Sequence, residues 1–419
     1  MGLKSLRGRL AAVAAASATV LGLITVGVAA AGPSADRPPP QAVQQGPLVF
    51  GHRGAAGYRP EHTLASYDLA IRLGADVIEP DLVTTKDGTL VARHEPEISA
   101  TTDVSAHPEF ADRRTTKLLD GVPTTGWFTE DFTLAELRTL RAKERIPDIR
   151  QHNTLYDGRY QVPTFQEVID LAKRESRRYG REIGIAPETK HPTYFRQQGK
   201  PLEPALIRTL TRNGLNRTGA KVWVQSFEVG NLKALRSVLR VHLVQLTSAT
   251  GAPYDFVASG DPRTYADLTT PAGLRGIARY ADVLGPDKNQ IVPRDATGRL
   301  LAPTTLVRDA HRARLDVVPY TFRNENTFLP LDFRRGTDPT AYGNAFAEYA
   351  LFFSLGVDGL FSDFSDTAVA GLLLALAATP IPEPPTLLLV IAALAGLGLV
   401  SATGNQKMGR LREGRIARS

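Results

Sequence analysis

Cysteine is absent from this sequence of 419 residues, and its absence excludes three kinds of chemistry. No disulfide can form, no thiolate can bind a metal ion, and no cysteine can act as a nucleophile. An exported protein with a large hydrophobic core does not require disulfides. The absence is therefore compatible with export, although it selects no compartment.

A surplus of charge is also missing from the middle of the chain. The formal net charge is +7, but the residues that produce it stand at the two ends. These are Lys4, Arg7 and Arg9, and then Lys407, Arg410, Arg412, Arg415 and Arg418 against Glu413. Because the residues between them are balanced, we expect no nucleic-acid partner and assign the basic ends to membrane interactions.

Residues 1–31 have the pattern of a secretory signal peptide, with a basic start, an apolar run and the small residues Ala29–Ala31. The alternative is a retained N-terminal membrane helix, since the apolar run is long for a signal. Residues 32–46 are rich in Pro, Ala and Gln and are expected to form a flexible leader.

Residues 380–419 begin with a proline-rich linker and continue with the apolar run Leu387–Ala402 and the basic tail. Those 16 residues are fewer than the roughly 20 that usually span a membrane. An uncharged run followed by bases is nevertheless typical of a stop-transfer segment. We expect an exported protein, extracellular or in the cell envelope, that contacts the membrane here. The alternative is a helix packed on the folded domain.

Short apolar runs that end in polar residues recur along the middle of the chain, with helical stretches between many of them. This alternation predicts an α/β fold, a (β/α)₈ TIM barrel over residues 47–372. The expected strands are Leu48–His52, Val77–Asp81, Leu90–His94, Ile183–Glu188, Val222–Ser226, His242–Leu246, Val283–Pro286, Val317–Thr321 and Gly359–Ser362. Because there is one run too many, one of the two around Gly88 is expected to belong to a hairpin.

Polar residues follow these strands at their C-terminal ends, which surround the active site of such a barrel. They are His52, Asp81, Glu188, Gln225, Asp287 and Thr321. The irregular block at about residues 95–162 follows His94, and we expect an insertion that roofs the active site. It would have a small core of its own, formed by Phe110, Trp127, Phe128 and Phe132. Residues 249–270 are expected to form part of the same rim.

The stretch from His52 to His94 combines the residues that hydrolysis of a phosphodiester requires. The two histidines can share the base and acid roles, because imidazole titrates near neutral pH. Glu79 and Asp81 face the same side of a strand, where two buried acids need a cation or a base between them. Their oxygens suit a hard divalent cation, and Arg53 can bind phosphate oxygens.

The order of these motifs over about residues 47–370 resembles the glycerophosphodiester phosphodiesterase family, and most closely its exported bacterial, periplasmic-type branch. The matching segments are His52–Gly54, Pro60–Leu64, Gly74–Asp76, Glu79–Asp81, His94, Pro187–Lys190, Gln225–Phe227, Pro319–Phe322 and Val357–Asp363. Two departures, Thr189 and the closing sequence Ser-Asp-Phe-Ser-Asp at 362–366, bear on substrate details more than on activity.

With the resemblance, we assign Glu79, Asp81 and Glu188 as metal ligands and His52 and His94 as acid and base, without deciding which histidine does which. All three ligands are hard oxygen donors, which favours Ca²⁺ or Mg²⁺ over zinc. The resemblance implies Ca²⁺ for the exported branch, with Mg²⁺ as the alternative.

Five further residues are expected to contact substrate or to support its binding. Arg53 and Lys190 would neutralise phosphate oxygens, with structural salt bridges as the alternative. Glu61 is placed at the pocket rim by the resemblance, although an acid at a helix start is common for dipole reasons alone. Phe227 and Tyr320 are expected to be pocket walls, with core packing as the alternative.

The expected function is metal-dependent hydrolysis of glycerophosphodiesters to sn-glycerol 3-phosphate and an alcohol. A lysophospholipase D or a hydrolase of wall glycerophosphate polymers would use the same site. A catalytically silent surface-binding protein would be favoured if a histidine or the acid pair were missing. A cyclic phosphate intermediate and direct attack by water both remain open, as does the oligomeric state.

Overall fold

The computed structural model of this chain describes residues 46–378. The expected signal peptide, the leader up to residue 45 and the C-terminal segment lie outside the described residues. Within residues 46–378, no helix has both the length and the hydrophobicity needed to cross a membrane.

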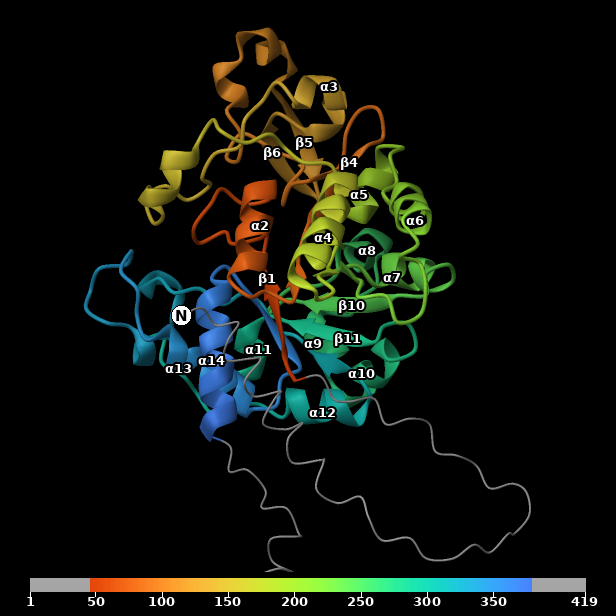
Figure 1. Ribbon diagram of the computed structural model, residues 1–419. Coiled ribbons are helices and arrows are strands. Elements are labelled where there is room, and N and C mark those ends of the chain that lie inside the picture. Colours follow the sequence, from red (N-terminus) through yellow and green to blue (C-terminus); the bar gives the residue numbers. More distant parts are fainter. Residues whose placement is uncertain (1–45, 379–419) are drawn as a thin grey trace, which may run out of the picture. The chain divides into compact units, whose positions relative to one another are not determined.

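Eight parallel strand positions form the centre of the described fold (Figure 1). In chain order they are β1 (Leu48–Gly51), β2 (Val77–Ile78) with β3 (Asp81–Thr84), β7 (Gly184–Ile185) with β8 (Glu188–Thr189), β9 (Trp223–Ser226), β10 (His242–Thr247), β11 (Val283–Pro286), β12 (Asp316–Val317) and β13 (Gly359–Ser362). Pro80 and Pro187 separate the members of the two split pairs, because proline cannot donate to the ladder.

The strand pairing follows the order of a barrel. The ladders run β13-β1-β2-β7 and β12-β11-β10-β9-β8-β3. Two hydrogen bonds connect the last two strand regions, from Asp358 N to Val317 O (2.8 Å) and from Phe361 N to Pro319 O (3.0 Å). The expected (β/α)₈ TIM barrel is therefore confirmed.

The ninth apolar run belongs to a hairpin, as the turn at Gly88 predicted. β4 (Leu90–Ala92) pairs antiparallel with β3, with Val83 opposite Val91. Gly88 has a φ of 78°, which glycine adopts without strain. His94 consequently enters the site from a hairpin arm and not from a barrel strand.

Helices surround the strands (Figure 1). They are α2 (Leu64–Arg72), α4 (Phe165–Tyr179), α5 (Pro192–Gln197), α6 (Glu203–Arg212), α7 (Val229–Arg236), α8 (Tyr254–Ser259), α9 (Tyr265–Leu268), α10 (Pro271–Ile277), α11 (Lys288–Ile291), α12 (Leu306–Arg312), α13 (Ala345–Ser354) and α14 (Ser365–Ala378). The longest, α4, begins at a capping box between Thr164 and Glu167 and ends at Gly180, whose φ of 61° is left-handed. These local signals define where the helix begins and where it ends.

The insertion after β4 packs on the β3–β4 hairpin. It contains the hairpin β5 (Thr115–Leu119) and β6 (Val122–Gly126), the short helix α3 (Leu134–Leu137), and 3₁₀ turns at Val104–Ala106, Pro108–Arg113, Thr129–Asp131 and Gln151–Tyr156. Phe110 and Phe132 stack edge to face with ring centroids 5.0 Å apart. Both belong to the same buried cluster as Val83 and Leu90 of the barrel hairpin, so the expectation of a separate small core is wrong.

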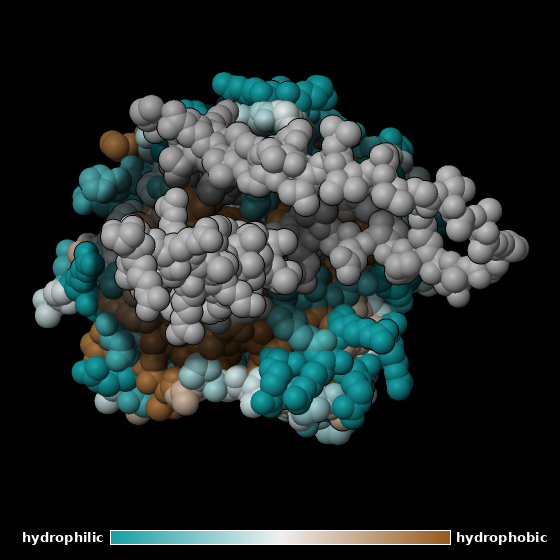
Figure 2. Space-filling view, turned by 60° about the horizontal axis from the view of Figure 1, so that its bottom comes forward, coloured by the Kyte–Doolittle hydropathy of each residue, from teal (hydrophilic) through white to brown (hydrophobic). Residues whose placement is uncertain are grey.

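Two further 3₁₀ turns, Asn326–Phe328 and Leu331–Phe333, lie in the long loop after β12. The outer surface is mixed in character. Figure 2, in which the bottom of Figure 1 comes forward, shows hydrophobic surface beside strongly hydrophilic surface. Among the exposed apolar side chains are Leu374 and Leu376 of α14, each 54% exposed, and neither lines the cavity described next.

Candidate active site

A cavity of about 400 Å³ opens at the C-terminal ends of the barrel strands. All six polar residues that the sequence places at strand ends line it, so the cavity lies where the sequence predicts the site. Nine of the ten residues proposed for the site also line it: His52, Arg53, Glu79, Asp81, His94, Glu188, Lys190, Phe227 and Tyr320. Glu61 is not among the lining residues.

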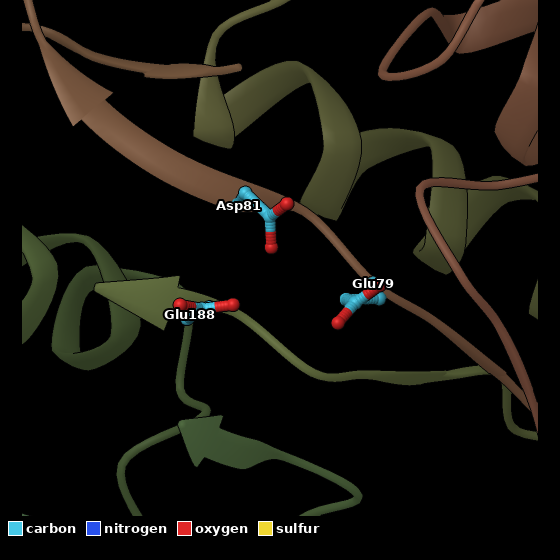
Figure 3. Close-up of side chains that lie close together, drawn as sticks. All are labelled: Glu79, Asp81 and Glu188. Carbon is cyan, nitrogen blue, oxygen red and sulfur yellow. The ribbon is translucent and has the colours of Figure 1, made fainter. Parts of the chain in front are cut away.

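Three buried carboxylates meet inside this cavity. Glu79 lies between β2 and β3, Asp81 begins β3, and Glu188 begins the neighbouring strand β8; Figure 3 shows the three side chains turned toward one another. One oxygen from each lies within 4.8 Å of the others. Oxygen donors at this spacing suit a hard divalent cation such as Ca²⁺ or Mg²⁺.

The charges of Glu79 and Glu188 are poorly compensated. Burial and the neighbouring Asp81 and Glu188 raise the pKa of Glu79 well above its usual range. Burial also raises the pKa of Glu188 to about 7, although the Lys190 ammonium opposes the shift. Oδ1 of Asp81 is buried and has no hydrogen-bond partner. A cation between the three groups would relieve the repulsion and satisfy this oxygen, so the residues fit a metal site.

His62 and Gln225 orient the carboxylates from behind. Nε2 of His62 lies 2.9 Å from Oδ2 of Asp81, and its Nδ1 lies 2.7 Å from the Tyr67 hydroxyl. Nε2 of Gln225 donates to Oε1 of Glu79 at 3.1 Å. His62 is fully buried, and its contacts fix the direction in which Asp81 points. Sequence reasoning placed Gln225 at a strand end beside the site but gave neither residue a role in it.

His52, directly after β1, is held by Asp363. Nδ1 of His52 donates to Oδ1 of Asp363 at 2.5 Å, and the arginines 150 and 323 hold the pKa of this carboxyl well below its usual range despite its burial. Burial and Arg53 lower the pKa of His52 to about 4. Because an ionised carboxylate can only accept, the proton of the neutral ring is on Nδ1. Nε2, 3.9 Å from Oε2 of Glu79, is free to accept a proton.

His94 has a similar environment on its Nδ1 side. Nδ1 of His94 lies 2.8 Å from Oε1 of Glu95, and Nε2 lies 3.4 Å from Nζ of Lys190. Burial and the positive charges of Arg53 and Lys190 lower the pKa of His94. Lys190 in turn pairs with Glu188 at 2.9 Å. The second histidine is therefore also neutral in this state and is directly adjacent to the metal ligands.

Arg53 and Glu61 form a buried pair at the cavity edge. Nη1 of Arg53 donates to both carboxylate oxygens of Glu61, at 3.1 and 3.0 Å, and Glu61 also accepts from Nε of Arg145. Arg53 has a φ of 55°, and its backbone N–H donates to Glu79. Glu61 thus lies behind the arginine and orients it. The salt bridges considered for Arg53 and Lys190 exist, although both side chains still line the cavity.

Aromatic and polar residues from the loops that follow the later strands complete the wall of the cavity. Phe227 and Tyr320 pack edge to face, with centroids 5.9 Å apart. The opposite part consists of residues that follow β11 and β12: Asp287, Lys288, Asn289, Arg294, Thr321, Arg323, Thr327 and Phe328. No described residue of 95–162 or of 249–270 lines the cavity itself, and the expected roof and rim stay predictions. The insertion contacts site residues through Glu95 on His94 and Arg150 on Asp363, and Tyr265 packs against Phe227.

Asp363, Arg150 and Arg323 are further residues to which sequence reasoning gave no role. Arg150 and Arg323 both donate to Oδ2 of Asp363, at 2.6 and 2.8 Å. Asp363 stands in the closing motif at the end of β13, so its place at a strand end was an available signal. Arg150 lies in the insertion, where no periodicity indicated its direction.

Comparisons with known proteins agree with this geometry. Residues 52–367 match the glycerophosphoryl diester phosphodiesterase family. Glycerophosphodiester phosphodiesterase GDPD6 of Arabidopsis thaliana is 38% identical over 339 residues, covering 76% of this chain and 84% of the relative. Glycerophosphodiester phosphodiesterase of Haemophilus influenzae is 29% identical over 343 residues, covering 77% of this chain and 88% of the relative. An Oleispira antarctica phosphodiesterase, solved with the product sn-glycerol-3-phosphate, has the same fold, with a TM-score of 0.50 at 19% identity. The match covers 78% of this chain and 97% of that structure.

Proposed function

Because this chain belongs to the glycerophosphoryl diester phosphodiesterase family and is a glycerophosphodiester phosphodiesterase, we propose that it works by metal-dependent acid–base catalysis with His52 and His94. The observation that carries the proposal is the cluster of three carboxylates within 4.8 Å, beside two neutral histidines. The substrate would be a small glycerophosphodiester and the products sn-glycerol 3-phosphate and an alcohol. The product bound to the Oleispira relative supports this substrate class.

Glu79, Asp81 and Glu188 would hold the divalent cation, for which we propose Ca²⁺, with Mg²⁺ as the alternative. When bound, such a cation would neutralise phosphate charge and make a nearby hydroxyl more acidic. His62 and Gln225 keep two of the ligands in place before any cation arrives. This preorganisation lowers the cost of assembling three carboxylates around one ion.

The two histidines would exchange protons at Nε2. His52 can accept a proton there because Asp363 occupies its Nδ1 side, and Asp363 stabilises the imidazolium that forms. His94 has the equivalent support from Glu95. One ring would remove the proton of the nucleophile and the other would protonate the leaving alcohol.

Arg53 and Lys190 would oppose the negative charge that builds on the phosphate oxygens in the transition state. Burial opposes a charge on Lys190, but the adjacent Glu188 keeps the pKa of its ammonium above the usual range. Both cations therefore stay charged at neutral pH. Phe227 and Tyr320 would bound the space for the substrate and limit access of water. We further propose that the enzyme acts outside the cell membrane, on the basis of the signal-like N-terminus.

The test is release of glycerol 3-phosphate from glycerophosphocholine by chelator-treated protein, with and without added Ca²⁺. We expect release only when Ca²⁺ is restored. Equal release in chelator would contradict the metal role. Failure with every divalent cation would contradict the proposed substrate, and lysophospholipids and wall glycerophosphate polymers would then be the substrates to test.

Single substitutions address the histidines separately. His52→Ala and His94→Ala are each expected to lower turnover at least about 100-fold, the scale of lost acid–base catalysis. Their thermal unfolding should stay cooperative. A variant with near-normal turnover would remove that histidine from the mechanism.

A further inference from the structure

A continuous chain of hydrogen bonds leads away from His94 on the side opposite the cavity. Nδ1 of His94 contacts Oε1 of Glu95 at 2.8 Å. The other oxygen of Glu95 contacts Nε2 of His191 at 2.8 Å, and Nδ1 of His191 contacts Oδ2 of Asp120 at 2.7 Å. Four ionisable groups thus alternate between imidazole and carboxylate. The proposed mechanism uses only the first two of them, His94 and Glu95.

The four residues come from three separate parts of the chain. His94 and Glu95 follow β4, whereas His191 stands between β8 and α5. Asp120 lies at the tip of the β5–β6 hairpin, within the insertion. Asp120 and His191 have φ angles of 48° and 46°, in the left-handed region that is uncommon for residues other than glycine but is adopted more often by Asn, Asp and His than by the rest. These turns accompany the contacts of Asp120 with His191 and of His191 with Glu95.

The charge on each member follows from its partners. Both nitrogens of His191 face carboxylate oxygens, so both must donate and the ring is a cation. Burial opposes this charge, but the bonds to Asp120 and Glu95 raise the pKa of His191 to about 9. The imidazolium keeps Glu95 ionised, and Glu95 therefore accepts a hydrogen bond from the Nδ1–H of His94. Nε2 of His94 is left without a proton on the side that faces Lys190.

We propose that Asp120 and His191 are positioning residues that orient Glu95 and, through it, fix the ring and the tautomer of His94. The relay, as we call Asp120, His191 and Glu95 together, gives the insertion a part in the reaction although none of its residues lines the cavity. The inference rests on the proposed catalytic role of His94. It assigns the hairpin tip to the support of proton transfer and not to the selection of substrates.

A purely structural role for the same contacts makes a different prediction. If the ion pairs only attach the hairpin to the barrel, their loss would change stability and leave the chemical step intact. The hairpin tip has another attachment, because Gly121 lies against the ring of Tyr254: a Cβ added there would be 3.7 Å from its Cε2. Removing one carboxylate therefore need not release the hairpin.

The experiment compares Asp120→Asn, His191→Asn and the double variant in the full chain, with glycerophosphocholine and saturating Ca²⁺. Asparagine tolerates the left-handed backbone at both positions, so the turns are preserved. We expect kcat to fall about 10- to 100-fold in His191→Asn, the range for loss of a group that orients a functional histidine. KM should change by less than about 2-fold. The double variant should be no worse than His191→Asn alone, because both residues act through Glu95.

The matched control is His107→Asn, which removes another histidine–carboxylate pair from the insertion: Nδ1 of His107 lies 2.9 Å from Oε1 of Glu109. We expect its kcat to equal that of the wild type. Wild-type kcat in His191→Asn, or a rise in KM with kcat unchanged, would overturn the relay. His94→Ala separates this failure from failure of the proposed function: if His94→Ala is inactive while His191→Asn is normal, only the relay is wrong.

Discussion

Replacement of Glu188 by glutamine is expected to stabilise the cation-free protein at pH 8 although it damages the active site. Glu188 is buried with Glu79 and Asp81, and burial raises the pKa of its carboxyl to about 7, so that at pH 8 the folded state holds an ionised carboxylate that it disfavours. Glutamine has the shape of the protonated carboxyl and cannot ionise. The substitution therefore removes a repulsion that the wild-type protein retains in the absence of a cation.

The size of the expected change in stability follows from the pKa of Glu188. Folding raises the pKa of Glu188 from 4.5 to about 7, so the folded state holds a proton that the unfolded chain releases between these values. The stability from this group is fully present below pH 4.5 and is lost as pH rises to about 7. At about 1.4 kcal/mol per pKa unit, the loss is about 3 kcal/mol. Above pH 7, cation-free Glu188→Gln should exceed the wild type by up to this amount.

Calcium should reverse the order of the two proteins. A ligand at about 1,000 times its dissociation constant stabilises the state that it binds by about 4 kcal/mol. The wild type should gain this amount, whereas the variant, with one anionic ligand fewer, should gain much less. The wild type would then be the more stable protein at pH 8.

The assay is thermal unfolding followed by the fluorescence of Trp127 and Trp223, at pH 5 and pH 8, in chelator and in excess Ca²⁺. Glu182→Gln, an exposed position close to Glu188 in the chain, is the control and should follow the wild type in all four conditions. The reasoning is refuted if cation-free Glu188→Gln is less stable than the wild type at pH 8. It is also refuted if Ca²⁺ raises the Tm of both proteins equally.

Two further predictions concern the groups around the cluster. Asp363→Asn should lower kcat by at least about 100-fold, because His52 loses its orienting carboxylate; steady-state kinetics check this. The same substitution should lower the free energy of unfolding by about 3–5 kcal/mol, because the buried arginines 150 and 323 lose a shared partner; thermal unfolding checks this. At subsaturating Ca²⁺, turnover should fall about tenfold per pH unit below pH 7, since a proton on Glu188 competes with the cation. A pH–rate profile that stays flat down to about pH 4, where His52 titrates, would contradict that assignment.

The metal cluster could be predicted from sequence because its members stand at fixed places on strands. Glu79 and Asp81 alternate on one strand, so their common direction follows from the period of two alone. Glu188 begins the neighbouring strand, and the barrel brings strand ends to one face. The regular geometry of the fold therefore carries most of the information about this part of the site.

The partners of the histidines could not be predicted in the same way. Asp363 lies 311 positions from His52 in the chain, and its two arginines come from loops. Loops have no periodicity that indicates where a side chain points. The insertion illustrates the limit: its position after His94 predicted that it lies near the site, but not that Arg150 would pair with Asp363 or that its apolar residues would join the cluster of the β3–β4 hairpin.

The two histidines share one arrangement built from unrelated segments. Each donates its Nδ1 proton to a carboxylate, and each carboxylate is bound on its other oxygen by a cation: Asp363 by two arginines, and Glu95 by the imidazolium of His191. A carboxylate stabilised in this way is a poor proton acceptor, so a proton that arrives at Nε2 stays on the imidazole and remains available for return to the substrate. If proton return is the function that these outer cations serve, their removal should slow the chemical step more than it weakens substrate binding, at both histidines alike.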